Sequence, residues 1–220
     1  MPDADMDEAI EQACVLFSNA GQSCVAGSRT FVHESIYDEF VKRAAKVAEG
    51  IKVGDPMDES STQGAIISKE QFEKILGYIE SGVKDGAKIV TGGKRIGEVG
   101  YFVQPTVFAD VQDSMKIAKE EIFGPVMCVL KWSDENDVIK RANSLPYGLG
   151  AGIVTKNVQK ALEMVSRLHA GTVYVNMYDY QEGSTPFGGV KDSGIGKDLG
   201  DEGVESYMYT KTVLIKANML

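Results

Sequence analysis

Apolar residues along this chain alternate between helical and strand-like spacing. Residues 36–48 carry five apolar side chains that fall on one face of a helix: Ile36, Phe40, Val41, Ala44 and Val47. Residues 126–132 form a short apolar run of the length expected for a strand. Helical and strand-like segments follow one another in this way through most of the chain. This alternation predicts an α/β fold with a mostly parallel sheet flanked by helices.

The same pattern predicts the other elements. Helices are expected at residues 6–17, from 68 to about 83, and at 136–142 and 158–168, and strands at 30–32, 88–91, 151–155 and 172–175. Residues 68–71 read Ser-Lys-Glu-Gln and have the form of a capping box, which opens a helix. The apolar, β-branched run at residues 212–215 is expected to be a terminal strand that pairs with another part of the fold or with a partner subunit.

Composition and charge limit the classes of function. Of the 220 residues, 43% are hydrophobic and 25% charged, which is ordinary for a soluble globular protein. The formal net charge is −9 and the basic residues are scattered, which argues against nucleic acid or an anionic membrane as the main partner. No segment approaches the roughly 18 apolar residues of a membrane span, and the acidic start does not resemble a signal peptide. Three cysteines suggest a reducing compartment without disulfides, so we expect the cytosol.

Cys24 is the first candidate catalytic residue, and it lies among small and turn-forming residues at 19–30. Small neighbours leave room for a substrate, and an accessible thiol with thiolate character is a nucleophile. A structural thiol is the alternative. Cys14 and Cys128 fall within an apolar helix and an apolar strand and are interpreted as core residues. The two histidines have no partner at a suggestive spacing, so we assign neither to catalysis.

The glycine-rich stretch at residues 188–200 does not form a dinucleotide-binding fingerprint. Gly194 and Gly196 would need a third glycine at position 199, where Leu199 stands, and no clear strand leads directly into the stretch. We interpret it as a loop. The chain therefore contains no recognisable nucleotide-binding Rossmann half of its own.

Three motifs, in this order and spacing, resemble those of aldehyde dehydrogenases. They read Gly-Gln-Ser-Cys at residues 21–24, Glu-Glu-Ile-Phe-Gly-Pro-Val at 120–126 and Ser-Thr-Pro-Phe-Gly-Gly at 184–189, and the stretches at 100–106 and 170–176 support them. The resemblance covers nearly the whole chain. It implies the catalytic domain of that family over residues 1–205 and a protruding C-terminal oligomerisation strand over residues 206–220.

The resemblance implies roles for single residues of the reaction centre. Cys24 matches the nucleophile that attacks the aldehyde carbon, and its backbone amide would donate to the oxyanion. Glu121 matches the carboxylate that holds the nicotinamide ribose of NAD or NADP. Phe123 matches the ring that positions the nicotinamide. Without the resemblance, Glu121 would be read as a loop or helix charge and Phe123 as a core aromatic. No metal site is implied.

Four further residues match positions around that centre. Gln71 and Lys74 match the edge of the cofactor site, and Phe187 and Asp179 match positions at or near the substrate tunnel. Three of these assignments also have a purely structural alternative. Gln71 is also the third residue of a capped helix, Lys74 has the position of a solvated helix charge, and Phe187 would by default be a core aromatic. Gln181 stands where relatives often have a tunnel aromatic, which is a departure from the family pattern.

The resemblance also predicts which catalytic groups this chain lacks. Full-length members carry an N-terminal Rossmann-type domain, together with a general-base glutamate and an oxyanion-hole asparagine. Losing one oxyanion donor costs about 10²–10³ in rate, and losing a general base costs about 10²–10⁴. We therefore expect little dehydrogenase turnover by this chain alone and no firm binding of NAD or NADP by it.

Three functions follow from this interpretation. The first is NAD(P)-dependent oxidation of a small aldehyde to a carboxylic acid, completed by an N-terminal half. The second is a structural or storage-like oligomer of the crystallin type. The third is a residual thiol function at Cys24, such as ester hydrolysis or aldehyde binding. The surface that relatives bury against the cofactor domain would be exposed here, which predicts a homo-oligomer, with a dimer favoured.

Overall fold

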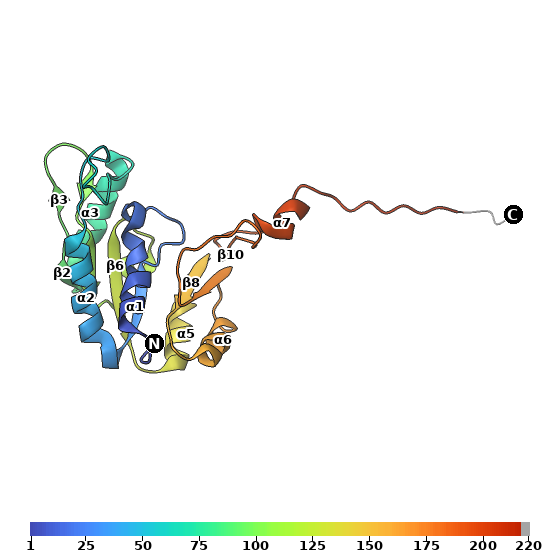
Figure 1. Cartoon of the computed structure of the whole chain (residues 1–220), viewed down its shortest axis with the longest axis horizontal. Helices are drawn as coiled ribbons and strands as arrows, with labels where there is room; N and C mark the ends of the chain where they lie inside the picture. Colours follow the sequence, from blue (N-terminus) through green and yellow to red (C-terminus); the bar gives the residue numbers. More distant parts are fainter. Residues whose placement is uncertain (217–220) are drawn as a thin grey trace.

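An open sheet lies at the centre of the computed structural model, which describes residues 1–216 (Figure 1). Its four strands are β1 (Arg29–His33), β6 (Val126–Trp132), β5 (Thr106–Ala109) and β2 (Lys88–Thr91), in that order across the sheet. Strands β1 and β5 both run parallel to β6, whereas β2 pairs antiparallel at one edge. The prediction of a mostly parallel sheet flanked by helices is confirmed.

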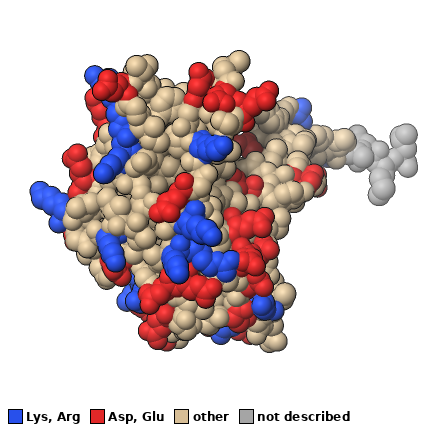
Figure 2. Space-filling view, turned by 60° about the vertical axis from the view of Figure 1, so that its left-hand side comes forward, with Lys and Arg blue, Asp and Glu red and all other residues tan. Residues whose placement is uncertain are grey.

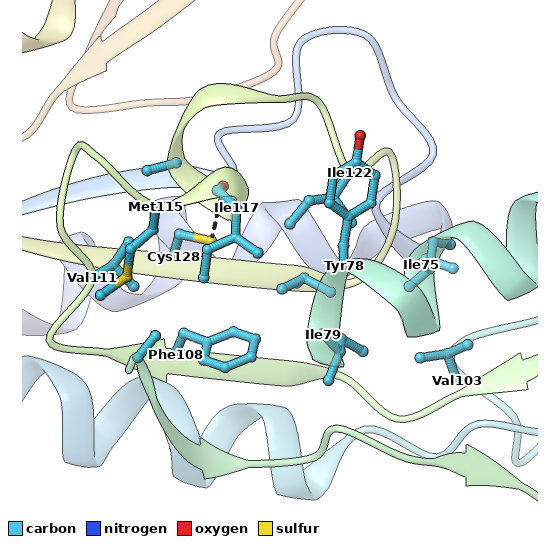
Figure 3. Close-up of a cluster of buried hydrophobic side chains, with 14 of the residues drawn as sticks. Ile75, Tyr78, Ile79, Val103, Phe108, Val111, Met115, Ile117, Ile122 and Cys128 are labelled. Atoms are coloured by element: carbon cyan, nitrogen blue, oxygen red, sulfur yellow. Dashed lines mark hydrogen bonds between the residues drawn. The ribbon is translucent and has the colours of Figure 1, made fainter. Parts of the chain in front are cut away.

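Strand β6 is buried on both faces because helices cover both sides of the sheet. Helices α1 (Met6–Cys14) and α2 (Tyr37–Gly50) pack with Met127 and Val129, whereas α3 (Lys69–Lys84) and α4 (Lys116–Lys119) pack with Cys128 and Leu130. Figure 3 shows this second cluster, in which Phe108 of β5 and Ile75 of α3 are completely buried. Successive side chains of a strand point to opposite faces, so the apolar run at residues 126–132 contributes to two cores.

A smaller unit follows along the chain. Strands β8 (Gly150–Ile153) and β9 (Thr172–Val175) pair in parallel. Their flanking helices are α5 (Glu135–Ala142) and α6 (Val158–Val165), and a third core cluster lies around Trp132, Ile139 and Met164. The remaining short elements are the 3₁₀ turn Glu34–Ile36, β3 (Arg95–Ile96) with β4 (Phe102–Val103), β7 (Tyr147–Gly148) with β10 (Val190–Lys191), and α7 (Gly200–Glu205).

The first predicted helix, at residues 6–17, is shorter than expected. Helix α1 ends at Cys14, and a kinked 3₁₀ segment, η1 (Val15–Gly21), follows it. Within η1, Asn19 and Ala20 have left-handed backbones with φ of 51° and 54°. The prediction was wrong at this end because the apolar pattern continues beyond the helix, where Leu16 and Phe17 are buried.

The C-terminal tail, residues 207–216, extends away from the body of the molecule (Figure 1). The strand predicted at residues 212–215 is not formed in the single chain, because a strand requires a pairing partner and the tail meets none within residues 1–216. The predicted oligomerisation segment at 206–220 also includes residues 217–220, which lie outside the described residues. In the described part of the chain, no helix is both long and apolar enough to span a membrane.

The surface charges are mixed in sign. On the face shown in Figure 2, lysine and arginine side chains are interspersed with aspartate and glutamate side chains. Near the middle of that face, a group of basic side chains is bordered by acidic ones.

Candidate active site

Cys24 lies at the corner of a β-turn formed by residues 23–26. The turn is closed by a hydrogen bond from the Ala26 N–H to the Ser23 carbonyl oxygen (3.1 Å). The Cys24 side chain is exposed, whereas the next residue, Val25, is only 3% exposed and anchors the turn. Within residues 1–216, no acceptor is found for the Cys24 backbone N–H. The turn therefore presents a thiol and a free N–H donor side by side, which are the two groups that attack on a carbonyl needs.

A close backbone contact joins this turn to the loop at residues 120–125. A Cβ atom on Gly21 would lie 2.1 Å from the Gly124 carbonyl oxygen, and Gly21 has a left-handed φ of 69°. A Cβ on Gly124 would in turn lie 2.6 Å from Cδ1 of Ile75. Position 21 therefore requires glycine, whereas a Cβ at position 124 would require the Ile75 side chain to shift. The motifs at residues 21–24 and 120–126, which are about a hundred residues apart in sequence, therefore touch through their glycines.

Gln71 holds the loop that carries Glu121 and Phe123. Ser68 Oγ accepts a hydrogen bond from the Gln71 N–H (3.2 Å), so half of the predicted capping box is formed. The Gln71 side chain does not return to Ser68; its Nε2 donates to the carbonyl oxygens of Ile122 (3.0 Å) and Phe123 (2.9 Å). Phe123 has a left-handed φ of 52°, which is unusual for an aromatic residue. The two hydrogen bonds stabilise this strained loop.

A cavity of about 550 Å³ has both Cys24 and Glu121 in its lining. Glu121 is exposed, whereas the neighbouring Glu120 accepts a hydrogen bond from Tyr78 Oη (2.9 Å). Phe123, two residues after Glu121, is half-buried and does not line this cavity.

Comparison with known proteins identifies the family. The family model described as "Aldehyde dehydrogenase family" matches residues 1–213. This chain belongs to the aldehyde dehydrogenase family. It is 54% identical over 212 residues to a mitochondrial aldehyde dehydrogenase of Leishmania tarentolae, covering 96% of this chain and 43% of the relative. It is 53% identical over 217 residues to the human mitochondrial aldehyde dehydrogenase, covering 98% of this chain and 42% of the relative.

Solved aldehyde dehydrogenases share the fold. A Bacillus cereus aldehyde dehydrogenase, described as an NAD⁺ complex, superposes with a TM-score of 0.96 at 44% identity, covering 99% of this chain and 45% of that one. A Mycobacterium tuberculosis aldehyde dehydrogenase complexed with NAD⁺ has a TM-score of 0.95 at 38% identity, covering 100% of this chain and 46% of that one. The chain therefore spans less than half the length of the relatives that it matches.

Of the two positions that match the aldehyde dehydrogenase substrate tunnel, Asp179 is half-buried in the loop that follows β9. The pKa of the neighbouring Tyr174 is raised by burial and, to a smaller extent, by Asp179 and Cys24. Burial also raises the pKa of Asp179 itself. Its assignment to the substrate site remains a prediction.

Among the residues that the resemblance assigns to the site, Cys24 and Glu121 line the same cavity. Five others do not line it: Gln71, Lys74, Phe123, Asp179 and Phe187. Lys74 is exposed on α3, with its ammonium group 5.8 Å from the centre of the Tyr78 ring. Phe187 is half-buried and exchanges two backbone hydrogen bonds with Asp198 (2.7 and 2.8 Å). Their roles at the cofactor edge and at the substrate tunnel therefore remain predictions that rest on the family resemblance.

The other two thiols differ from Cys24 in their surroundings. Burial raises the pKa of Cys14 to about 11 and that of Cys128 to about 12. Cys128 Sγ also lies 3.5 Å from the Ile117 carbonyl oxygen, as a weak donor, in the core cluster (Figure 3). A thiol with so high a pKa is protonated at neutral pH and is a poor nucleophile. Cys24 is the exposed thiol among the three.

Sequence reasoning missed Tyr178. Its Oη donates a hydrogen bond to the Val25 carbonyl oxygen (2.9 Å), directly beside Cys24 in the turn. No local pattern points to this contact, because the two residues are separated by 153 positions.

Proposed function

We propose that this chain carries the catalytic half of an NAD(P)-dependent aldehyde dehydrogenase, which oxidises a small aldehyde to the carboxylic acid. The observation that carries the proposal is the contact between Gly21 and Gly124, because it joins the loops of Cys24 and Glu121 at one cavity. Family membership over residues 1–213 supports the same chemistry.

Cys24 performs the bond-forming step of this proposal. Its sulfur attacks the aldehyde carbon, a C–S bond forms, and the carbonyl oxygen becomes an oxyanion while the thiol proton leaves to water. The free backbone N–H of Cys24 donates to that oxyanion. The small residues around the turn leave the sulfur accessible, so no side chain has to move for the aldehyde to approach.

Glu121 and Phe123 support the binding of a nicotinamide dinucleotide, NAD or NADP. The exposed carboxylate of Glu121 would hold the ribose, and the Phe123 ring would contact the flat nicotinamide. Gln71 acts indirectly by holding the Phe123 loop, and Lys74 would lie at the outer edge. The dinucleotide, when bound, supplies the hydride acceptor. Two relatives of known structure are described as NAD⁺ complexes.

The test is complementation. The chain is mixed with a separately produced N-terminal half of one of the relatives, and NADH formation from NAD⁺ and aldehyde is measured with and without that half. We expect aldehyde-dependent NADH from the mixture, at least about 100-fold less from the chain alone, and none from a mixture with Cys24→Ser. A folded complex that binds NAD⁺ but stays silent with a panel of aldehydes would contradict the proposal.

A thiol function without cofactor is the second candidate. The exposed Cys24 sulfur and its free N–H would suffice to attack an ester, because acyl transfer needs no hydride acceptor. Slow hydrolysis of an activated ester by the chain alone, lost in Cys24→Ser, would support this candidate.

We also propose a homo-oligomer, with a dimer favoured. The tail exposes six large apolar or aromatic side chains that nothing covers within residues 1–216: Tyr207, Met208, Tyr209, Val213, Leu214 and Ile215. An exposed apolar segment of this kind is typical of a surface that pairs with a partner. A storage-like oligomer would share this assembly but would ignore NAD⁺ and aldehydes, which calorimetry with NAD⁺ distinguishes when the N-terminal half of a relative is added to the chain.

For the compartment we propose the cytosol, because all three cysteines are free. Several relatives are named mitochondrial, among them the human one. Fractionation of the source cells decides between the two compartments.

A further inference from the structure

Tyr178 holds the turn of Cys24 from the side of the small sheet. Its Oη donates to the Val25 carbonyl oxygen at 2.9 Å. That carbonyl belongs to the same peptide group as the Ala26 N–H, which closes the turn by donating to Ser23. The peptide group after Val25 is therefore fixed at both ends, through its oxygen by Tyr178 and through its nitrogen by Ser23.

Glycines provide the space for the Tyr178 ring. A Cβ on Gly152 of β8 would lie 2.5 Å from Cδ2 of the ring, and a Cβ on Gly27 would lie 3.3 Å from its Cζ. The ring of Tyr174 packs against it, with the ring centres 5.1 Å apart. Burial raises the pKa of Tyr178, so its hydroxyl stays protonated and remains a donor. Because the half-buried ring packs against these residues, the hydroxyl can leave the carbonyl only if they repack.

We infer that Tyr178 is a positioning residue for Cys24, and this inference rests on the proposed role of Cys24 as the nucleophile. By fixing the peptide group after Val25, Tyr178 holds the backbone of the turn, and with it the Cys24 N–H and the Cα–Cβ bond that carries the sulfur, in one conformation. Attack on a carbonyl needs both groups, because the sulfur must reach the carbon while the N–H meets the oxygen. Alkylation at a saturated carbon needs the sulfur alone.

Two reagents separate these requirements in the full chain. With p-nitrophenyl acetate, a C–S bond forms between Cys24 and the acetyl carbon, the ester C–O bond breaks, p-nitrophenolate leaves with the bonding pair, and the thiol proton goes to water. With iodoacetamide, the sulfur displaces iodide from a saturated carbon. In Tyr178→Phe, which keeps the ring, we expect acylation of Cys24 to slow about tenfold and alkylation to stay within about twofold of the parent.

Tyr174→Phe is the matched control. Its hydroxyl is buried and has no hydrogen-bond partner within the described residues, so its removal should leave both rates unchanged. Equal acylation rates in the parent and in Tyr178→Phe would overturn the inference, and so would a parallel fall of acylation and alkylation.

A parent chain that is alkylated but never acylated at Cys24 would count against the proposed function. Hydrogen exchange still tests the inference in that case. The Ala26 amide should exchange faster in Tyr178→Phe and at the parent rate in Tyr174→Phe. Unchanged exchange in Tyr178→Phe would overturn the inference, whatever the chemistry of Cys24.

Discussion

Backbone conformation around Cys24 accounts for the small residues in its neighbourhood. Asn19, Ala20 and Gly21 follow one another in the left-handed region, with φ of 51°, 54° and 69°. Each such conformation costs a residue with a side chain about 1–2 kcal/mol, so the surrounding packing must offset it. Ala20, only 1% exposed, is held by the core, and Gly21 contacts the Gly124 backbone. The sequence of this segment thus reflects the sharp reversal that brings Cys24 to the loop at residues 120–125.

The substitution Gly21→Ala tests that close contact. Its Cβ would meet the Gly124 carbonyl and would also require a left-handed alanine, so we expect unfolding to become easier by at least about 2 kcal/mol. Urea denaturation measures this. Gly64→Ala is the control, because a Cβ there meets no atom within 4 Å, and it should change stability by less than about 0.5 kcal/mol. Equal stabilities of the two variants would contradict the account.

At the scale of elements, helix α3 stabilises the loop between α4 and β6. Gln71, in its first turn, donates to two carbonyl groups of that loop, and Ile75, one turn later, packs under Gly124. The helix thereby fixes the backbone on which Glu121 and Phe123 are carried. The loop contains Phe123 in a strained left-handed conformation and has few hydrogen bonds of its own. Its conformation therefore depends on α3.

Gln71→Ala should loosen the loop without unfolding the chain. It leaves two backbone carbonyl groups without their donor, which costs roughly 1–3 kcal/mol. We expect faster hydrogen exchange at residues 120–124. We also expect the midpoint of urea denaturation to fall by an amount that corresponds to this cost. Lys74→Ala, an exposed change one turn further along the same helix, serves as the control and should affect neither. Unchanged exchange at residues 120–124 in Gln71→Ala would show that α3 does not hold this loop.

The sequence predicted those elements whose apolar periodicity is clear. Strands at residues 88–91, 126–132 and 172–175 were placed correctly, and α2 and α3 were placed to within about two residues. Strand β5, whose four residues are all buried, was not predicted.

For the site, the resemblance supplied Cys24, Glu121, Phe123 and Gln71, but neither the contacts of Gln71 nor Tyr178. The side chain of Gln71 reaches across 51 positions to Ile122, and Tyr178 reaches across 153 to Val25. Contacts between residues so far apart arise only in the tertiary structure. A local pattern of apolar and polar residues cannot indicate them.

At the scale of the whole molecule, the tail is the feature that a single chain does not explain. It projects from the body with its apolar side chains exposed (Figure 1). We expect the full chain to elute as a dimer by size exclusion with light scattering, and a chain ending at residue 206 to be a folded monomer. The circular dichroism spectrum of the shortened chain should match that of the full chain. A clean monomer mass for the full chain across concentrations would contradict a tail-mediated dimer.

The central claim is that Cys24 is the nucleophile of this chain, and competition among its three thiols tests it most directly. The chain is treated with a limiting amount of iodoacetamide at neutral pH, digested, and mapped by mass spectrometry. Because burial raises the pKa of Cys14 to about 11 and that of Cys128 to about 12, both should stay unlabelled while the exposed Cys24 takes the reagent. Equal labelling of the three cysteines, or labelling of Cys14 before Cys24, would contradict the account.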